Sequence, residues 1–377
     1  MPVSVARGQH QEPRRGLSFL ALLLYVLTVV SCRDTASRSL WSRSSRALTA
    51  DPSKPPDPPP VCPQPGDVPD PFPPDLPSGP TAEIGTLSGA FSVTASGDAA
   101  YSIPLSVLPG RAAIEPDLAI TYTSSGDDGP LGHGFSLTGL STITRCPRNL
   151  AQDGAIWPVH DDHADALCMD GQRLVPLDVP IDHDPLNPYQ SREYRTYPDT
   201  FTRIRADFAE SEGWPAHRGP KRLRAFTKSG LVLDYGSTAD GQVLSRNQVV
   251  RTWLLTRMSD KSGNTLDVHY HNRLHPTDGY TVEHAPTRID YTGHPLAPPS
   301  RAVEFVYGPL EDAETRVFYA RGLELRRSLR LAVIRMLGPG DALVRQILLD
   351  YAQAPATGRL LLHSIEECTA AGACRPP

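Results

Sequence analysis

The fold of this protein is decided by residues 85–148, which read GTLSGAFSVTASGDAAYSIPLSVLPGRAAIEPDLAITYTSSGDDGPLGHGFSLTGLSTITRCPR. Short runs of alternating apolar and polar residues recur in this stretch, at residues 90–93, 101–103, 118–122 and 135–137. Glycine, proline, aspartate and serine bound each run, a pattern typical of half-buried strands joined by turns. Pro109-Gly110 and residues 126–130 suit chain reversals, and Gly132-His133-Gly134 lets two backbone segments approach closely. The stretch therefore predicts antiparallel strands without helix.

Several short motifs in this stretch occur in a characteristic order. They are Ser102-Ile103-Pro104, Pro109-Gly110-Arg111, Pro116-Asp117-Leu118, Leu131-Gly132-His133-Gly134-Phe135-Ser136-Leu137, Gly139-Leu140-Ser141 and Ile143-Thr144-Arg145-Cys146-Pro147. In order and spacing they resemble the N-terminal domain shared by SpvB-type virulence proteins and the B subunits of bacterial Tc insecticidal toxin complexes. The resemblance continues, more thinly, to Pro377. It implies an all-β, multi-stranded antiparallel domain. In Tc toxins the matching domain contributes to the shell and propeller assembly that encloses a toxic peptide and docks on the pore subunit.

Composition sets bounds on this interpretation. The 377 residues include 39 prolines and 29 glycines, and only 39% of them are hydrophobic, so part of the chain cannot pack a core. A formal net charge of −5 and an isoelectric point near 6.2 give no reason to expect a nucleic acid as a partner. The composition fits a turn-rich β protein with a separate unfolded segment.

Residues 1–32 have the pattern of a targeting segment. Three arginines precede the apolar run of residues 17–30, which is too short to span a bilayer. The run ends in Val29-Val30-Ser31-Cys32, which resembles a bacterial lipobox and predicts lipidation of Cys32. Arg33 follows, and by resemblance to known lipoproteins this favours the outer membrane or cell surface. The alternative is an ordinary secretory signal with Cys32 incidental.

Residues 33–80 are predicted to be a disordered, proline-rich linker. Between Asp51 and Pro80 there are 14 prolines, which lack amide donors and favour extended polyproline II. Such a segment would act as a stiff stalk that lifts the following domain, residues 81–377, away from a membrane surface. The alternative is a ligand for a proline-binding module, a partner found mainly inside eukaryotic cells.

Two related units occur within residues 81–377. Lys228-Ser229-Gly230 precedes a strand that contains Asp234 and Tyr235, and Lys261-Ser262-Gly263 precedes one that contains Asp267 and Tyr270. The pattern predicts a hairpin turn that leads into a strand, repeated so that neighbouring units can pair edge to edge. It resembles the tyrosine-aspartate repeats of the Rhs family, from which Tc subunits build a hollow β-shell.

The cysteines suit an exported protein. With Cys32 assigned to lipid and Cys62 alone in the linker, Cys146, Cys168, Cys368 and Cys374 remain. Proximity favours disulfides between Cys146 and Cys168 and between Cys368 and Cys374, although four cysteines permit three connectivities. Neither pair has the CxxC spacing of a metal site.

The sequence contains only weak signals for catalytic or metal-binding sites. His160-Asp161-Asp162-His163 contains metal-ligand residue types, but a solvated polar insertion is the preferred interpretation. Glu210-Ser211-Glu212 matches the Glu-x-Glu pair of ADP-ribosyltransferases, without the upstream arginine and Ser-Thr-Ser strand that the nicotinamide pocket requires. No Gly-x-Ser-x-Gly motif or phosphate-binding glycine loop is present, so neither a catalytic residue, a metal nor a cofactor is predicted.

Six arginines lie between Arg316 and Arg335. They fit either a polyanion-binding face or, as the preferred interpretation, a solvated strand pair whose arginines meet acidic residues.

Together these features predict a non-enzymatic assembly module of a secreted toxin or virulence system. The expected partners are a shell-forming Rhs or TcC-like subunit, a pore-forming TcA-like subunit, and the membrane through lipid on Cys32. The expected location is the outer membrane, the cell surface or the medium, with cytoplasmic assembly open for toxin homologues. The alternatives are a truncated remnant of a longer toxin and an ADP-ribosyltransferase-associated virulence enzyme.

Overall fold

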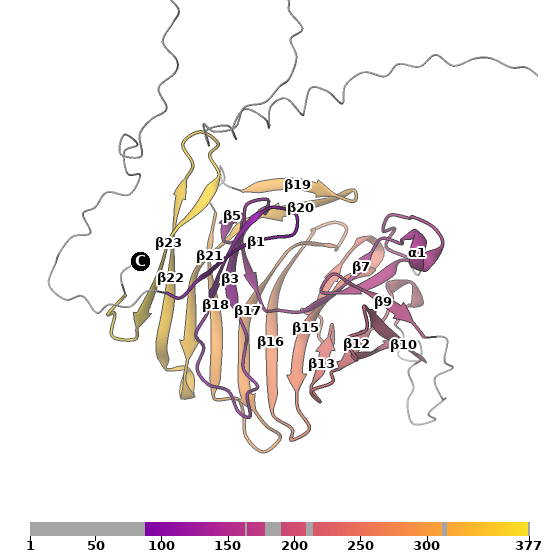
Figure 1. Cartoon of the computed structure of the whole chain (residues 1–377), viewed down its shortest axis with the longest axis horizontal. Coiled ribbons are helices and arrows are strands. Elements are labelled where there is room, and N and C mark those ends of the chain that lie inside the picture. Colours follow the sequence, from indigo (N-terminus) through magenta and orange to yellow (C-terminus); the bar gives the residue numbers. More distant parts are fainter. Residues whose placement is uncertain (1–86, 163, 178–189, 209–213, 311–314, 376–377) are drawn as a thin grey trace, which may run out of the picture. The chain divides into compact units, whose positions relative to one another are not determined.

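The computed structural model describes residues 87–162, 164–177, 190–208, 214–310 and 315–375 (Figure 1). The chain divides into two units, Met1–Leu76 and Pro77–Pro377, and all of these residues belong to the second unit. The targeting segment with Cys32, the proline-rich segment and Cys62 lie outside the described residues. Within the described part, no helix is long and apolar enough to cross a membrane.

The described residues form an almost entirely β structure, which confirms the predicted fold class. Their one α-helix, α1 (Leu150–Asp153), is a single turn in which the Asn149 side chain accepts a hydrogen bond from the Gln152 amide. The remaining helical turns are of the 3₁₀ type: η2 (Ala216–Arg218), η3 (Arg246–Gln248) and η4 (Pro339–Asp341).

The stretch that opens the domain forms a four-stranded antiparallel sheet in the order β1-β2-β3-β6. Its strands are β1 (Ala90–Val93), β2 (Ala99–Pro104), β3 (Ala119–Thr123) and β6 (Phe135–Thr138). They match the four predicted runs to within two residues. Between β3 and β6, β4 (Asp128–Gly129) pairs with β5 (Gly132–His133). Gly132 has a φ of +85°, and a Cβ there would lie 2.7 Å from the Leu360 carbonyl oxygen, so the predicted close backbone approach is confirmed.

The next part of the chain forms a closed, eight-stranded antiparallel barrel. Its strands are β7 (Thr142–Cys146), β8 (Ala166–Met169), β9 (Gln172–Pro176), β10 (Gln190–Tyr197), β11 (Arg203–Phe208), β12 (Arg222–Phe226), β13 (Val232–Tyr235) and β15 (Val250–Ser259). β15 closes the barrel because it pairs with β7 at one end and with β13 at the other. Apolar side chains fill the interior, among them Trp253, Tyr235 and Ile204, which are fully buried.

From β15 the sheet also continues outward as an open series in the order β16-β17-β18-β21-β22-β23. These strands are β16 (Thr265–Leu274), β17 (Thr281–Gly293), β18 (Arg301–Pro309), β21 (Leu329–Leu337), β22 (Leu343–Gln353) and β23 (Leu360–Thr369). The short β14 (Gln242–Leu244) pairs with the start of β15. β19 (Arg316–Ala320) and β20 (Leu323–Arg327) form a separate hairpin between β18 and β21.

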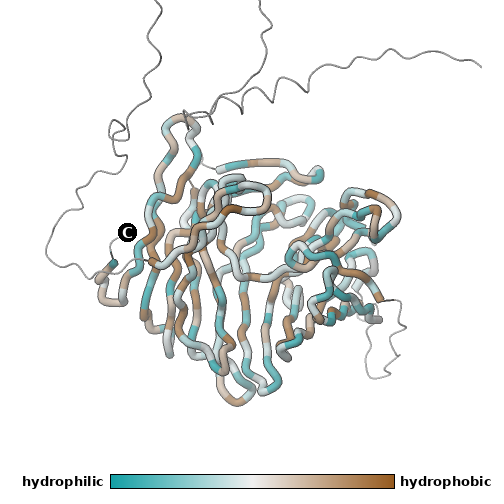
Figure 2. Tube along the Cα trace, in the orientation of Figure 1, coloured by the Kyte–Doolittle hydropathy of each residue, from teal (hydrophilic) through white to brown (hydrophobic). Residues whose placement is uncertain are grey.

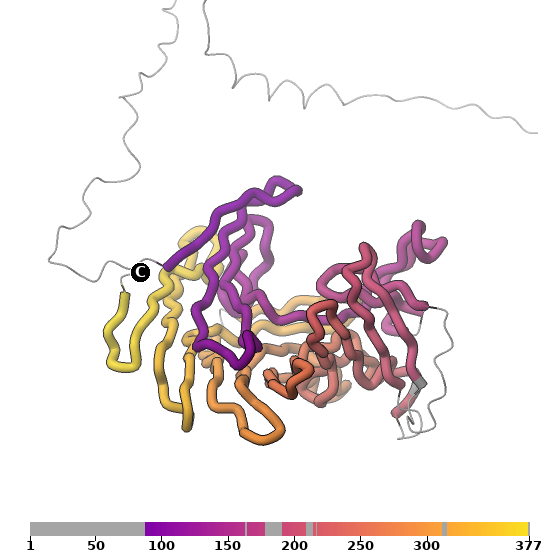
Figure 3. Tube along the Cα trace, turned by 60° about the horizontal axis from the view of Figure 1, so that its bottom comes forward, coloured from indigo at the N-terminus to yellow at the C-terminus, as the bar shows by residue number. Residues whose placement is uncertain are grey.

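The four-stranded sheet packs against this open series through one hydrophobic core. Ile120 of β3 and Leu118, just before β3, belong to the same buried cluster as Leu254, Val303 and Ile347 of the long sheet. Figure 3 shows the N-terminal segment, in indigo, as a layer beside the orange and yellow strands. Hydrophilic and hydrophobic residues alternate along the strands in Figure 2, because successive side chains point to opposite faces of a sheet.

The two Lys-Ser-Gly units have the same local structure. In each, a glycine with positive φ donates its amide to the carbonyl three residues earlier, from Gly230 to Thr227 (3.0 Å) and from Gly263 to Asp260 (3.2 Å). Glycine suits this position because side chains are strained at such φ values. The predicted hairpin turns are therefore present in both units.

The strands that follow these turns do not pair with each other, contrary to the predicted edge-to-edge pairing. Instead β13 and β16 pair with opposite edges of β15. Arg257 of β15 consequently stands between Asp234 of β13 and Asp267 of β16 in the register, and its Nε donates to Asp267 at 2.5 Å. The two units flank a shared strand, at the point where the barrel joins the open sheet.

Candidate functional site

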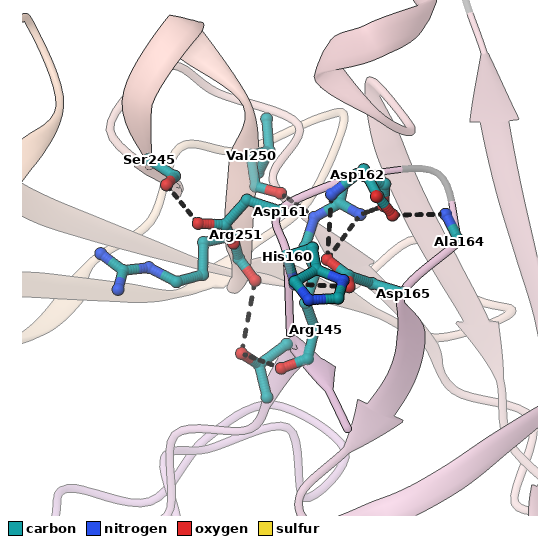
Figure 4. A network of polar contacts seen from close by, with 10 residues as sticks. Arg145, His160, Asp161, Asp162, Ala164, Asp165, Ser245, Val250 and Arg251 are labelled. Carbon is teal, nitrogen blue, oxygen red and sulfur yellow. Dashed lines mark hydrogen bonds and ion pairs between the residues drawn. The ribbon is translucent and has the colours of Figure 1, made fainter. Parts of the chain in front are cut away.

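The loop between β7 and β8 contains the candidate metal motif and is organised around Asp165 (Figure 4). The Asp165 carboxylate accepts hydrogen bonds from the backbone amides of His160 (2.8 Å) and Asp162 (3.0 Å). Asp162 in turn accepts one from the Ala164 amide at 2.8 Å. The sequence predicts a solvated insertion here, which is correct for the exposed His160 but wrong for Asp161 and Asp162, since both are half-buried. His163 lies outside the described residues.

Arg145 of β7 carries the positive charge of this network. Its side chain is 3% exposed, its Nε donates to the Val250 carbonyl at 2.8 Å, and a terminal nitrogen lies 3.5 Å from Asp165. The guanidinium also stands 5.6 Å from the ring centroid of Trp253, inside the barrel. Burial lowers the pKa of Arg145, while Asp165, Asp161 and Asp162 act in the opposite direction. The cluster therefore holds a buried, compensated charge that joins the loop to β15.

Asp161 links this network to Ser245 and to Arg251 of β15. It occupies the left-handed backbone region at a φ of +60° and accepts a hydrogen bond from the Ser245 hydroxyl. Its charge raises the pKa of Arg251, opposing the larger lowering caused by burial. The other carboxylate oxygen of Asp161 is buried without a hydrogen bond among the described residues.

A polar cavity of about 560 Å³ adjoins the network at the barrel strands β7–β11. Its charged lining residues are Arg145, Arg148, Arg173 and Arg192 together with Asp153 and Asp165. Four arginines face two aspartates, so the lining has an excess of positive charge. Residues 178–189 and 209–213, which include Glu210, Ser211 and Glu212, follow strands that line this cavity but lie outside the described residues.

His160 does not belong to a cluster of possible metal ligands among the described residues. Its ring lies edge-on to that of Trp157, with 5.9 Å between the centroids. In the described part of the chain, one group of three possible ligands lies close enough to share an ion: Glu366, Cys368 and Cys374. The two cysteines of that group are joined to each other, so their thiolates are not available as ligands.

The disulfides have the pairings that proximity favours. Cys146 and Cys168 join the adjacent strands β7 and β8, with 5.8 Å between their Cα atoms. Cys368 of β23 is joined to Cys374, six residues later. There the Arg375 amide donates to the Glu367 carbonyl at 2.9 Å, so the chain turns back along β23.

The arginines between Arg316 and Arg335 lie on the β19–β20 hairpin and on β21. Four of them have partners: Arg326 pairs with Glu324 (2.9 Å), Arg335 pairs with Glu304 (3.2 Å), Arg327 stacks on Phe318 (4.6 Å) and Arg330 stacks on Tyr351 (5.4 Å). The two ion pairs agree with the preferred interpretation of arginines that meet acidic residues, whereas Arg327 and Arg330 contact aromatic rings.

Among the sheet edges that have no further strand in the described residues are those of β23 and β1. β23 pairs with β22 along its length and has no second strand partner in the described part of the chain, although Gly132 of β5 lies close to the backbone of Leu360 and Leu362 and Cys374 bridges back to Cys368. At the other open edge, β1 pairs only with β2 and is exposed at every residue, including Phe91 (67%) and Val93 (64%). Open strand edges and exposed apolar side chains favour association with another chain. The alternating sequence pattern identified β1 as a strand but did not show that it lies at an edge.

Solved structures of toxin complexes share this fold. The crystal structure of TcdB2-TccC3 matches with a TM-score of 0.60 and 18% identity, over 76% of this chain and 16% of that chain. The Tc holotoxin pore of Photorhabdus luminescens matches with a TM-score of 0.58 and 18% identity, over 75% of this chain and 15% of that one. This chain thus spans about one sixth of the length of these toxin subunits.

A smaller relative matches over nearly its whole length. The N-terminal domain of the effector protein SpvB from Salmonella typhimurium strain LT2 has a TM-score of 0.54 and 17% identity, over 71% of this chain and 99% of that chain. No curated protein sequence matches the chain. The sequence model of SpvB, the Salmonella virulence plasmid 65kDa B protein, matches residues 93–290, more than half of the 377 residues. Motifs, fold and family model agree, and the chain belongs to the SpvB family.

Proposed function

We propose that this protein is a non-catalytic structural module of a toxin complex or related virulence system. The observation that carries the proposal is the fold shared with the TcdB2-TccC3 structure over 76% of the chain. The edge of β23 adds support, because a strand edge without a partner can pair with a strand of another chain. The module would supply one wall of a toxin shell.

The proposed partner is a shell-forming Rhs or TcC-like subunit, or a pore-forming TcA-like subunit. An exposed edge recruits a further strand through main-chain hydrogen bonds, and its side chains select which strand fits. On β23, Leu361 is 37% exposed and the neighbouring His363 is also exposed. A partner strand placed beside β23 would cover both side chains.

Co-purification of the full chain with separately encoded shell and pore subunits tests this assignment. Leu361→Lys places a charge at the proposed interface and is expected to reduce recovery of the partner. Leu296→Lys is the matched control, because Leu296 is 89% exposed in the β17–β18 connection, and it should leave recovery unchanged. Equal recovery with both variants, or no partner recovered by the unaltered chain, would reject the assembly role.

Export and lipid anchoring form the second part of the proposal. Val29-Val30-Ser31-Cys32 supports lipidation of Cys32, and the proline-rich residues 33–80 would hold the β domain away from the outer membrane or cell surface. In a Gram-negative host, Cys32→Ser is expected to abolish labelling with a radioactive fatty acid and to release the protein from the membrane fraction. Cys62→Ser, in the linker, is the control. Undiminished membrane association of Cys32→Ser would refute the anchor.

The enzyme alternative makes an opposite prediction. It requires Glu210 or Glu212 to support transfer of ADP-ribose from NAD to a target protein. We expect neither NAD turnover by the full chain nor an effect of Glu212→Ala on toxicity. NAD-dependent modification that disappears in Glu212→Ala would replace the structural assignment with an enzymatic one.

A further inference from the structure

The open sheet divides between β17 and β18. Their pairing ends at Arg288 and Glu304, although β17 extends back to Thr281 and β18 extends on to Pro309. Beyond this point β17 stays paired with β16, whereas β18 stays paired with β21. The sheet therefore forks, and the fork is bridged by the Glu283 carboxylate, which accepts hydrogen bonds from the Ser328 and Leu329 amides at 2.6 and 3.1 Å.

A β-bulge lies on each side of this fork. On one side the register of β16 and β17 shifts where Tyr270 meets Pro286. On the other side the register of β18 and β21 shifts where Tyr307 meets Leu331. A proline inside a sheet is tolerated at a bulge, and bulges redirect side chains next to binding and active sites. The two irregularities occur at the same level of the sheet.

These four residues line one cavity of about 420 Å³. The loop that contains β4 and β5 covers the cavity, and it is fixed there by a hydrogen bond of 2.9 Å from the Leu331 amide to the Pro130 carbonyl. Most of the lining is apolar, and it includes Phe135 and Leu137. A volume of roughly 300–1,000 Å³ with apolar walls and few polar groups is typical of small-molecule sites.

Two polar side chains of the cavity lining make no hydrogen bond to other described residues: His284 of β17, which is exposed, and Tyr307 of β18, which is half-buried. Desolvation by the surrounding protein lowers the pKa of His284 and raises that of Tyr307, so both groups are neutral near pH 7. Both groups can therefore donate or accept a hydrogen bond to a ligand in the cavity. The carboxylates in the lining belong to Asp127 and Asp128, and His133 pairs with Asp128 at 2.8 Å.

We propose that the fork between β17 and β18 is a binding site for a small, uncharged aromatic molecule that carries a hydroxyl group. Its ring would pack between Tyr270, Pro286 and Phe135, and its hydroxyl would reach Tyr307 and His284. This assignment is tested separately from the proposed assembly role, because neither Leu361 nor His363 of β23 lines the cavity.

Titration of the full chain with 2-naphthol, followed by the fluorescence of the ligand, tests the site. Naphthalene serves as the matched ligand without a hydroxyl. The unaltered protein is expected to bind 2-naphthol at one saturable site and more tightly than naphthalene. Tyr307→Phe keeps the ring but removes its hydroxyl, so it should weaken 2-naphthol binding by roughly tenfold and leave naphthalene binding unchanged.

Two further variants locate the site. Ala285→Leu fills the cavity from the buried Ala285 and should abolish binding of both ligands. Tyr319→Phe changes a tyrosine that is 72% exposed on the β19–β20 hairpin and should change neither affinity. The proposal is overturned if the unaltered protein shows no saturable binding, or if Tyr307→Phe binds 2-naphthol as tightly as the unaltered protein does. The second criterion applies even if Ala285→Leu fails to fold.

Discussion

The barrel and the open sheet share β15 but solve the problem of strand edges in opposite ways. In the barrel, β15 pairs with both β7 and β13, so the eight strands leave no free edge. In the open series, each strand pairs with the next until β23, which has a free edge among the described residues. Closure satisfies backbone hydrogen bonds within the chain, whereas an open edge leaves them for another strand.

One ion pair in each region also differs in its exposure to solvent. The barrel buries Arg145 and Asp165, each 3% exposed, whereas the open sheet keeps its pair of Arg335 and Glu304 at 42% and 34% exposed. A buried pair resists separation because each charge is costly without the other, while an exposed pair is screened by water. For these two pairs, the comparison indicates that the barrel depends more on its ion pair than the open sheet depends on its own.

The largest expected effect is the loss of Arg145. Arg145→Ala leaves Asp165 buried without its counter-charge and should lower the free energy of unfolding by about 3–5 kcal/mol. Arg335→Ala, in the open sheet, is the control and should cost about 0–1 kcal/mol. Urea denaturation of both variants measures the difference. A similar loss in the two variants would show that the barrel has no special dependence on its buried charge.

The disulfides provide an intermediate effect. Replacing Cys146 and Cys168 by serine opens a loop of 22 residues and should cost about 3.4 kcal/mol by loop entropy. The same change at Cys368 and Cys374 opens a loop of six residues and should cost about 2.2 kcal/mol. Thermal unfolding under non-reducing conditions measures both. If loss of the Cys368–Cys374 disulfide lowered the stability more than loss of the Cys146–Cys168 disulfide, loop entropy would not explain the contribution of the disulfide at the end of the open sheet.

The smallest expected effect is a pH dependence confined to the open sheet. Burial and, to a lesser extent, Arg251 lower the pKa of His284, and Glu283 opposes them. Between that lowered pKa and the ordinary value of about 6.5, the unfolded chain binds more protons than the folded one. Stability is therefore present above about pH 6.5 and declines as the pH falls through this window.

Hydrogen exchange locates this effect. Protection factors of amides in β17 and β18 should fall between about pH 7.5 and about pH 5.5, while those in the barrel stay constant. His284→Gln should remove the decline, and His269→Gln, in the exposed part of β16, should not. A uniform decline across both regions would argue against His284 as its source.

The strands of the first sheet were predictable because apolar and polar residues alternate along them, as in half-buried strands. The residue at which β17 begins could not be predicted in this way. The sequence predicts a strand from Thr287, after Pro286, whereas β17 begins at Thr281 and passes through Pro286. A bulge opposite Tyr270 accommodates the proline, and the position of that bulge depends on β16. Proline marked an irregularity in the sequence but did not show that the strand continues.

The site around Arg145 was only half visible in the sequence. Arg145 follows Ile143 by two residues, so both lie on the same face of β7, and Ile143 is fully buried. Alternation alone thus pointed Arg145 inward, while its charge argued for solvent. Arg145 can be buried because the carboxylate of Asp165, 20 residues later in the chain, pairs with it. A local sequence pattern does not specify which loop carboxylate will pair with a strand arginine.

The close approach of Gly132 to Leu360 also determines when this domain can finish folding. The two residues lie 228 positions apart, and the β4–β5 loop is further attached to Leu331. At synthesis rates of about 5–20 residues per second, the first sheet waits roughly ten to fifty seconds for the strand that receives it. During that interval the first sheet can pack only against strands that are already made, such as those that contain Leu254 and Ile289. Gly132 therefore belongs to a contact that can form only after β23 has been made.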